Sequence, residues 1–233
     1  MGKVSYIQIK QVKDKFDNID KEVLTNLGLY NDISLNTEQL LTKLNGATVL
    51  VTGGSGSIGS ELCKQLIELK IRKLIILDIY ENSTYMLYQD ILLIKKRKSI
   101  DCDIKLVIGS VCDEKVLEDL FKSESIDYVF HAAAYKHVPL MEANPCEAVN
   151  ANVIGSMNVA DMAVKYGVEK MVMVSTDKAV NPTNVMGASK RISEMLIQNL
   201  NQHSKTEYVA VRFGNVLGSS GSVVPLFKKQ IEQ

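Results

Sequence analysis

Thr52-Gly-Gly-Ser-Gly-Ser-Ile-Gly59 is the segment of this 233-residue chain from which its architecture can be worked out. It follows an apolar run and opens a stretch with apolar residues at helical spacing, which predicts a tight turn from a strand into a helix. Gly53 permits the turn, Gly56 allows the main chain to approach a pyrophosphate, and Gly59 allows the helix to lie close to the sheet. The N–H groups at the helix start would then bind the phosphates of a dinucleotide. The predicted cofactor contacts of this segment are Gly53, Ser55, Gly56, Ser57, Ile58 and Gly59.

Short β-branched runs alternate with longer amphipathic stretches from residue 47 onward. The runs predicted as strands are 48–52, 74–78, 105–108, 128–131, 170–175 and 208–212. Because five helical segments fit between these apolar runs, we expect a doubly wound, Rossmann-like α/β fold: a parallel sheet with helices on both faces and right-handed crossovers. This domain is predicted to cover residues 46–233, after a short helical N-terminal extension over residues 1–45.

Asp78 ends the second predicted strand, 19 residues after Gly59. A carboxylate at this place can accept hydrogen bonds from ribose hydroxyls and would repel a 2′-phosphate. The cofactor is therefore predicted to be NAD or NADP, with NAD favoured. Ala132 and Ala133 follow the fourth predicted strand, and their small side chains would let the cofactor pass close to the main chain.

The composition argues against several classes of function. The chain carries 27 basic and 27 acidic residues, so no strong electrostatic field would draw it to nucleic acid. The basic run 95–98 is predicted to be a solvated helix end. Four cysteines and three histidines show no metal-ligand spacing, which predicts no metal site and reduced thiols in a cytoplasmic protein. No apolar run has the length of a membrane-spanning helix, so no membrane segment is expected.

A second segment, which runs from Val174 to Lys190, has the layout of a nicotinamide-enzyme active site. Met186 stands four residues before Lys190 on the same predicted helix face, where a catalytic tyrosine would be expected. A thioether does not titrate. The acid/base chemistry is therefore expected to involve Asp177 and Lys178, which follow the fifth predicted strand.

Four blocks of the sequence carry a resemblance to a known family. They are His131-Ala-Ala-Ala-Tyr-Lys-His-Val-Pro-Leu-Met-Glu142, Ser175-Thr-Asp-Lys178, Asn181-Pro-Thr-Asn-Val-Met-Gly187 and Arg212-Phe-Gly-Asn-Val-Leu-Gly218. Together with the glycine-rich turn, they make the chain similar to the extended short-chain dehydrogenase/reductase superfamily. Within it, the chain resembles the UDP-N-acetylglucosamine 4,6-dehydratases of capsular and O-antigen polysaccharide biosynthesis over about residues 46–230. The resemblance extends to a subgroup with methionine at the tyrosine position.

The resemblance implies a lyase that uses tightly bound NAD(P) and acts on a UDP-N-acetylglucosamine-type nucleotide sugar. Such an enzyme removes hydride from C4 of the sugar, eliminates water across C5 and C6, and returns the hydride to C6. By this resemblance, Asp177 is the general acid for the C6 hydroxyl and Lys178 is the base at C5. Lys190 would hydrogen-bond the nicotinamide ribose. Asp177, or a water held by Thr176 and Lys190, would accept the C4 hydroxyl proton, and a homo-oligomer is expected.

Further contacts are predicted from the same resemblance. Ser110 stands where many members have an aspartate, so the adenine amine is expected to meet the main chain at Val111 or another side chain, and Ser110 and Val111 are both predicted cofactor contacts. Ser175 is predicted to contact the cofactor. The predicted substrate contacts are Lys136, His137, Asn152 and Asn215, with a structural role as the alternative for the last three.

Three functions stay open from the sequence. Family members continue beyond Gln233 with residues that build most of the uridine and diphosphate pocket, so we expect a C-terminally truncated chain whose substrate part is largely missing. Ser220 also replaces a common arginine. A dehydratase is favoured over a catalytically silent dinucleotide-binding or assembly module. A C4 epimerase is less favoured, because it needs no acid/base pair at C5 and C6 and usually keeps its tyrosine.

Tyr166-Gly-Val-Glu-Lys170 has tyrosine–lysine spacing, but it precedes the strand ending at Ser175 and is interpreted as a helix end.

Overall fold

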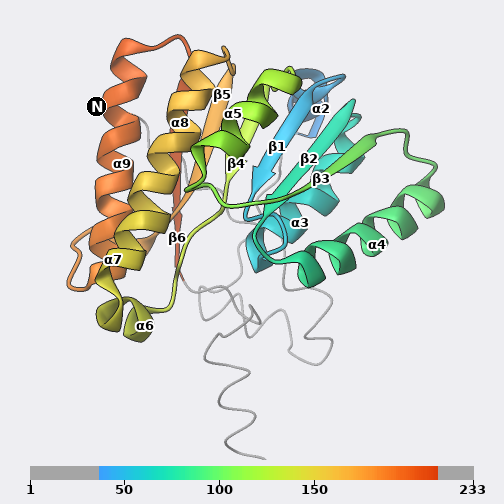
Figure 1. The fold of residues 1–233 in the computed structure, drawn as a ribbon. Helices are drawn as coiled ribbons and strands as arrows, with labels where there is room; N and C mark the ends of the chain where they lie inside the picture. The colour runs from blue at the N-terminus through green and yellow to red at the C-terminus, as the bar shows by residue number, and fades with distance from the viewer. Residues whose placement is uncertain (1–36, 215–233) are drawn as a thin grey trace, which may run out of the picture.

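The computed structural model describes residues 37–214, whose centre is a six-stranded parallel sheet (Figure 1). Its order is β3-β2-β1-β4-β5-β6, so the chain starts in the middle of the sheet and winds outward to both edges. The strands are β1 (Thr48–Thr52), β2 (Lys73–Asp78), β3 (Asp103–Ile108), β4 (Tyr128–His131), β5 (Lys170–Thr176) and β6 (Glu207–Phe213). All six predicted strands are present, and the prediction of a doubly wound, Rossmann-like sheet is confirmed.

Helices cover both faces of this sheet (Figure 1). One face packs against α5, α8 and α9, and the other packs against α2, α3 and α4. The helices are α2 (Thr37–Leu44), α3 (Ser57–Leu66), α4 (Glu81–Lys98), α5 (Glu114–Ser123), α6 (Val138–Ala143), α7 (Pro145–Ala148), α8 (Gly155–Lys165) and α9 (Val185–His203). Three short segments join them: η1 (Ile67–Leu69), the π-helical η2 (Val149–Ile154) and η3 (Asp177–Ala179).

The side chains of β1 divide between two hydrophobic cores. Leu50 packs in the core that includes α5, α8 and α9, whereas Val49 and Val51 pack in the core that includes α2, α3 and α4. This division follows from the two-residue repeat of a strand. Every residue of β1 is buried, as expected for a parallel strand that is covered on both faces.

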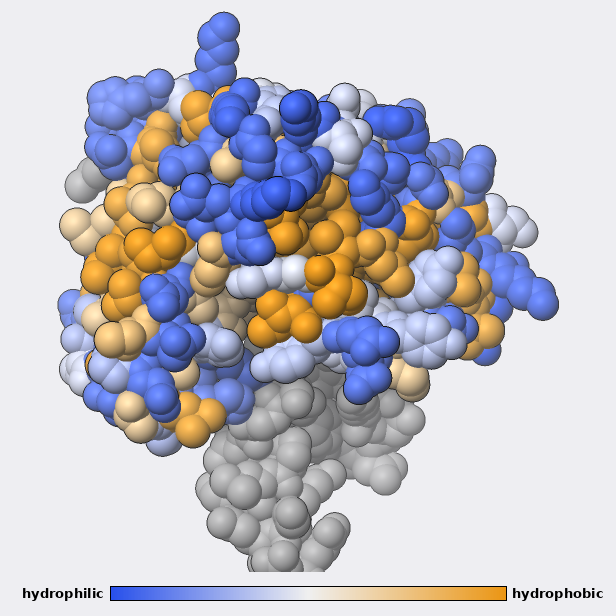
Figure 2. Space-filling model, viewed as in Figure 1, coloured by the Kyte–Doolittle hydropathy of each residue, from blue (hydrophilic) through white to orange (hydrophobic). Residues whose placement is uncertain are grey.

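The winding of the sheet changes direction between β1 and β4. In doubly wound sheets, the crevice at the carboxyl ends of such strands is where ligands bind. Figure 2 shows apolar side chains gathered in the middle of this face, near these strand ends. Ile79 and Ile108, which lie at the carboxyl ends of β2 and β3, are 45% and 50% exposed. This edge therefore offers an apolar rim that a nucleotide could cover.

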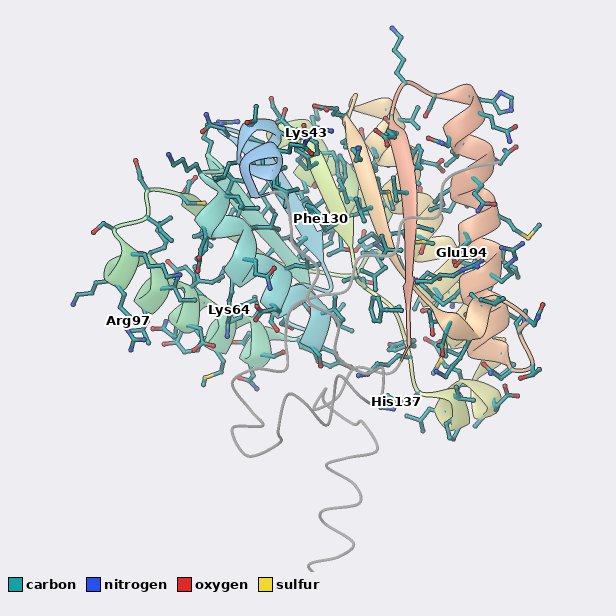
Figure 3. The ribbon with its side chains drawn as sticks, turned by 180° about the vertical axis from the view of Figure 1, so that it is seen from behind. Lys43, Lys64, Arg97, Phe130, His137 and Glu194 are labelled. Carbon is teal, nitrogen blue, oxygen red and sulfur yellow. The ribbon has the colours of Figure 1, made fainter. Side chains whose placement is uncertain are left out.

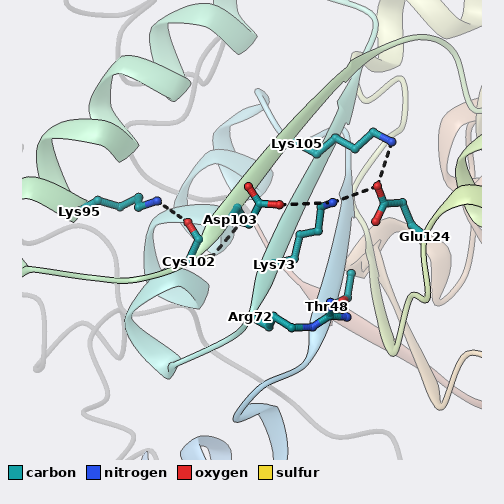
Figure 4. Close-up of polar contacts among 8 residues, drawn as sticks. All are labelled: Thr48, Arg72, Lys73, Lys95, Cys102, Asp103, Lys105 and Glu124. Carbon is teal, nitrogen blue, oxygen red and sulfur yellow. Dashed lines mark hydrogen bonds and ion pairs between the residues drawn. The ribbon is translucent and has the colours of Figure 1, made fainter.

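The amino-terminal ends of β2 and β3 carry ion pairs instead (Figure 4). Lys73 at the start of β2 lies 3.3 Å from the Asp103 carboxylate and 3.0 Å from the Glu124 carboxylate. Lys105 of β3 also donates to Glu124, at 3.0 Å. These contacts join β2, β3 and the end of α5 at the amino-terminal ends of the strands. The glycine-rich turn lies at the opposite, carboxyl ends.

Local sequence signals explain where several helices begin and end. The Asp113 side chain accepts hydrogen bonds from the N–H groups of Lys115 and Val116 and so caps α5. The basic run 95–98 forms the last turn of α4, as predicted, where cations complement the helix dipole. Tyr166 directly follows α8, so its interpretation as a helix end is confirmed.

Only the last part of the predicted N-terminal extension falls within the described residues. Its helix α2 contributes Leu44 to the core beside α3, and the Tyr128 hydroxyl donates to the carbonyl of Lys43 at 3.3 Å. The domain boundary at residue 45 stays a prediction. Among the helices of residues 37–214, none combines the length and apolar character that crossing a membrane requires.

Two glycines with positive φ provide a matched test of the turn after β1. Gly53 has φ +63°, and a Cβ there would lie 2.5 Å from the main-chain nitrogen of Ala133. Gly167 has φ +70°, and a Cβ there would have no neighbour within 4 Å. We expect Gly167→Ala to lower the free energy of unfolding by about 1 kcal/mol, from backbone strain alone. Gly53→Ala should lower it by about 3 kcal/mol or more, because steric overlap is added.

Urea denaturation of both variants measures this difference. Equal losses for the two variants would show that the contact between Gly53 and Ala133 is not tight in solution.

Candidate functional site

The glycine-rich turn is fastened to the end of β2. The N–H of Gly53 donates to the Leu77 carbonyl at 2.8 Å, and the N–H of Ser55 donates to the Asp78 carboxylate at 2.9 Å. Asp78 also accepts from the N–H of Tyr80 at 3.0 Å. This carboxylate therefore shapes the turn and the start of α4, in addition to the ribose contact predicted for it.

The turn is packed main chain against main chain. A Cβ on Gly59 would lie 2.1 Å from the carbonyl oxygen of Gly53, so α3 lies directly against the turn, where the sequence analysis expected the close contact to be with the sheet. A Cβ on Gly54 would lie 2.5 Å from the Ile76 side chain, a constraint that the sequence analysis missed. At Gly56, a Cβ would meet only the Gly53 carbonyl, at 3.3 Å.

The start of α3 fits the phosphates of a dinucleotide. The helix begins at Ser57 and has Gly56 as its N-cap, which carries no side chain to accept from the N–H groups of the first turn. A bound phosphate would accept from such groups. The N–H of Ala132 donates to the Thr52 carbonyl at 3.0 Å, which keeps the segment after β4 close beside the turn.

Ser110 and Val111 lie in the segment after β3, at the same edge of the sheet. The Ser110 hydroxyl accepts from the N–H of Cys112 at 3.1 Å. The Val111 carbonyl accepts from the Asn158 side chain at 3.2 Å. The adenine contact predicted at Val111 stays a prediction.

Asp177 and Lys178 form an ion pair directly after β5, with Lys178 Nζ 3.2 Å from Asp177 Oδ1. Their side chains are 55% and 35% exposed. The Thr176 hydroxyl donates to the same Asp177 oxygen at 2.9 Å. Partial burial works to raise the pKa of Asp177, but the hydrogen bonds from Thr176 and Lys178 outweigh it and lower this pKa. The lowered pKa keeps Asp177 ionised at neutral pH, so it can act as an acid only after it has taken up a proton.

Lys190 carries a buried ammonium group on α9. Its residue is 4% exposed, and Nζ has no hydrogen-bond partner within residues 37–214. Burial lowers the pKa of Lys190 to about 8, although the charge of Glu194 opposes this shift. A buried polar group without a partner is costly. The hydroxyls of a nicotinamide ribose would supply the missing acceptors, so Lys190 and the glycine-rich turn both fit a dinucleotide.

Met186 lies in the first turn of α9 and is 4% exposed. Its side chain packs with Met141 of α6 and Ala148 of α7. The position expected for a catalytic tyrosine is thus part of a small apolar cluster. It adds no titratable group beside Lys190.

A buried hydrogen-bond chain that the sequence analysis did not identify connects β1 to α8. His131 Nδ1 lies 2.7 Å from the Thr52 hydroxyl, and Nε2 lies 2.9 Å from the Ser156 hydroxyl. Because Ser156 donates its own proton to the Asn152 carbonyl, His131 must donate from Nε2 and accept from Thr52 at Nδ1. Burial, and to a lesser extent the charge of Lys190, lowers the pKa of His131 to about 3, so this histidine is neutral.

Asn152 is fully buried, and its side-chain amide is used by neighbouring groups. Its oxygen accepts from the N–H of Tyr135 at 2.8 Å, and its nitrogen donates to the Tyr135 carbonyl and to the Ser189 hydroxyl at 3.0 Å. Asn152 therefore holds the main chain after β4 against α9. This is one of the roles that the sequence allowed for it, and direct substrate contact stays a prediction.

The remaining predicted substrate contacts are less enclosed. Lys136 and His137 are exposed in the segment between β4 and α6, with His137 at the N-cap of α6 (Figure 3). Asn215 and Ser220 lie outside the described residues. Within the described part of the chain, no group of three or more His, Cys, Asp or Glu side chains could hold a metal ion.

Ser175, a predicted cofactor contact, is hydrogen-bonded to Glu194, a buried residue that the sequence analysis did not single out. The Ser175 hydroxyl donates to this carboxylate at 2.6 Å, so a cofactor contact would have to use its main chain or a lone pair. The signal available in the sequence was the spacing of Glu194, which stands four residues after Lys190 on one helix face.

Comparison with known proteins finds relatives whose names refer to polysaccharide biosynthesis and to nucleotide sugars. The family model described as "Polysaccharide biosynthesis protein" matches residues 49–233. The capsular polysaccharide biosynthesis protein CapD of Staphylococcus aureus is 47% identical over 217 residues, which are 93% of this chain and 36% of CapD. A UDP-N-acetylglucosamine 4,6-dehydratase (inverting) of Campylobacter jejuni is 39% identical over 193 residues, which are 81% of this chain and 55% of that enzyme.

The fold is also found in solved structures of related proteins. The X-ray structure of Pen from Bacillus thuringiensis has a TM-score of 0.73 and 36% identity, and the match covers 82% of this chain and 56% of Pen. UDP-glucose 4-epimerases of Rickettsia are 39 to 41% identical to the chain. The chain spans only about a third to a little over half of the length of these relatives.

The buried, neutral state of His131 predicts a pH dependence of stability. The unfolded chain takes up a proton at this histidine below a pH of about 6.5, whereas the folded chain does so only near 3. Stability should therefore be complete above pH 6.5 and fall as the pH drops below it. We expect wild type to lose about 1 kcal/mol more of its free energy of unfolding than His131→Asn between pH 7.5 and pH 5.5.

Urea denaturation at several pH values gives these free energies. The matched control is His203→Asn, which removes an exposed histidine at the end of α9 and should keep the wild-type pH dependence. The assignment is wrong if His131→Asn retains the full wild-type loss.

Proposed function

This chain belongs to the polysaccharide biosynthesis protein family, and we propose that it carries the cofactor-binding and acid/base machinery of a UDP-N-acetylglucosamine 4,6-dehydratase. The observation that carries the proposal is the Asp177–Lys178 ion pair at the carboxyl end of β5, on the segment that leads into the helix of the buried Lys190. An oxidation at C4 alone needs no such pair. Elimination needs both a proton acceptor at C5 and a proton donor at C6.

The residues that would hold the cofactor come from three elements. The turn after β1 and the start of α3 would bind the diphosphate, Asp78 would accept from a ribose, and Lys190 would donate to the other ribose. When bound, a nicotinamide dinucleotide supplies the oxidising and reducing power at the sugar carbon. The chain's own contribution is to orient the sugar and to move protons.

Asp177 can serve both proton transfers in sequence. Its lowered pKa keeps it ionised at neutral pH, so it can take the proton of the C4 hydroxyl, directly or through a water. The same proton is then available to the C6 hydroxyl, which leaves as water. Lys178, beside it, would first release its ammonium proton to solvent and then take the C5 proton as a neutral amine. This order supplies the proton that a carboxyl group with a lowered pKa would otherwise lack at neutral pH.

Two other functions have support of their own. The similarity to UDP-glucose 4-epimerases favours epimerisation at C4. Met186, which adds no titratable group beside Lys190, favours a nucleotide-binding module that does no chemistry by itself. A cytoplasmic location and a homo-oligomer belong to the dehydratase proposal.

One incubation separates these three functions. The chain is mixed with UDP-N-acetylglucosamine and NAD, and the sugar products are identified by NMR. A 4-keto-6-deoxy sugar without net NADH supports the dehydratase, whereas a C4-epimerised sugar supports the epimerase. Bound NAD with unchanged sugar would contradict the dehydratase proposal for this chain.

Asp177→Asn tests the acid/base assignment. We expect dehydration to slow by about 100-fold or more, since general acid/base groups contribute about that much, while the Kd for NAD stays the same. Asp119→Asn is the matched control, because Asp119 is also an exposed acid in an ion pair, 3.1 Å from Lys115 on α5. Undiminished dehydration by Asp177→Asn would show that the acid/base assignment of Asp177 is wrong.

Asp78→Asn tests the cofactor preference. Wild type should bind NAD at least about tenfold more tightly than NADP, because a 2′-phosphate next to the Asp78 carboxylate is repelled. The variant should lose affinity for NAD, since an amide cannot accept from both Ser55 and Tyr80, and its preference between the two dinucleotides should narrow. Calorimetric titration with each dinucleotide measures both effects. Equal affinities of wild type for the two would overturn the preference.

A further inference from the structure

Lys190 and Glu194 lie one turn apart on α9, at a spacing where a lysine and a glutamate commonly pair. They do not pair here. Lys190 Nζ has no hydrogen-bond partner within residues 37–214, although both residues are buried in the same part of the helix. The reason is found on the Glu194 carboxylate, whose side chain is 1% exposed.

Other donors occupy both oxygens of Glu194. Oε1 accepts from the Ser175 hydroxyl at 2.6 Å and from Arg212 Nε at 2.8 Å. Oε2 accepts from Arg212 Nη2 and, at 3.2 Å, from Arg191 Nη1. The two bonds from Arg212 form a bidentate pair, which is the strongest arrangement of this kind. Glu194 lies on the side of α9 that faces β6, the strand that carries Arg212 (Figure 3).

We propose that Arg212 and Glu194 form a positioning pair that keeps the Lys190 ammonium available for the cofactor. Arg212 occupies the carboxylate and so prevents an ion pair within α9 that would draw Lys190 away from the site. This role rests on the proposed nicotinamide-binding function of the chain. Neither residue touches the reacting atoms, so both act through Lys190.

The same pair also fixes the segment that carries Asp177. Ser175, the residue before Thr176, donates to Glu194 from the end of β5, and Arg212 reaches it from β6. Gly214, two residues after Arg212, has its Cβ position 3.8 Å from the nearer Asp177 carboxylate oxygen. The Glu194 carboxylate on α9 thus binds the ends of β5 and β6. The acid/base segment begins directly after β5.

Two titratable groups act on the charge of Lys190. Glu194 favours the charged form, and His131, which is neutral over the working pH range, would oppose it only if protonated. A change in the pKa of Lys190, measured by titration between pH 6 and pH 10, therefore reports on Glu194. This gives a measurement that does not depend on turnover.

The test measures two quantities in wild type, Arg212→Met, Glu194→Gln and the double variant. The first is the pKa of Lys190, from the pH dependence of its ¹³Cε chemical shift, assigned with Lys190→Arg. The second is the Kd for NAD at pH 7.5. In Arg212→Met, Glu194 should pair with Lys190, so the pKa of Lys190 should rise and NAD should bind about tenfold more weakly or worse. In Glu194→Gln, the pKa of Lys190 should fall below the wild-type value.

The double variant distinguishes positioning from general support of the fold. Without the carboxylate there is nothing to draw Lys190 away, so adding Glu194→Gln to Arg212→Met should restore NAD binding toward the wild-type value. Arg212→Lys, which keeps the cation, should stay close to wild type in both measurements. If Arg212→Met does not fold, Arg212→Gln takes its place, and the same rise of the Lys190 pKa and weaker NAD binding are expected for it.

Shifts of the Lys190 pKa in the same direction in both single variants would overturn the proposal, because loss of structure moves a buried lysine toward its ordinary value in either case. Weaker NAD binding in the double variant than in Arg212→Met would also overturn it. Failure of the chain to dehydrate UDP-N-acetylglucosamine, with the opposite pKa shifts intact, would refute the dehydratase proposal and leave the positioning pair standing.

Discussion

The close contact between the turn after β1 and the main chain after β4 is the constraint on which the rest of the site depends. The Cβ position of Gly53 lies only 2.5 Å from the nitrogen of Ala133, and that of Gly59 lies 2.1 Å from the Gly53 carbonyl oxygen. Glycine is required at both places, so β1, β4 and α3 meet without side chains between them. This junction lies where the winding of the sheet reverses, and α3, whose N-cap Gly56 has no side chain to accept from the first-turn N–H groups, begins beside it.

A buried polar chain carries this constraint from the sheet to α9. Thr52 at the end of β1 bonds His131, which bonds Ser156, and Asn152 connects the same region to Ser189. Every member is paired, as buried polar groups must be if they are not to cost stability. The Lys190 ammonium, one residue after Ser189, is the exception among the described side chains. We infer that a ligand supplies the missing acceptor of this buried group.

The sequence predicted those parts of the molecule that depend on local pattern. Each strand of the doubly wound sheet is a mainly apolar run, and the glycine spacing predicts the turn because the positive φ of Gly53 and the contact of Gly59 with the Gly53 carbonyl are demands within the turn itself. The pairing of Ser175 with Glu194 could not be predicted in this way, because it depends on how α9 packs against β5 and β6. His131 was visible only as part of a motif, since its partners come from β1 and α8. Contacts between elements decide such roles, and composition and periodicity do not encode them.

The methionine at position 186 gives a reason for the hydrogen bonds that Ser175 and Arg212 make beside the segment after β5. Its thioether packs against Met141 and Ala148 and offers no proton, so in the proposed function α9 would contribute only the Lys190 ammonium. We infer that acid/base work has moved from the helix to Asp177 on the adjoining segment. A catalytic group on a helix is positioned by the helix itself, whereas one on a segment beyond a strand needs support from its neighbours. The bonds from Ser175 and Arg212 to the Glu194 carboxylate provide that support directly before and beside Asp177. On this inference, the methionine at the tyrosine position and the buried Arg212–Glu194 ion pair are two parts of one arrangement.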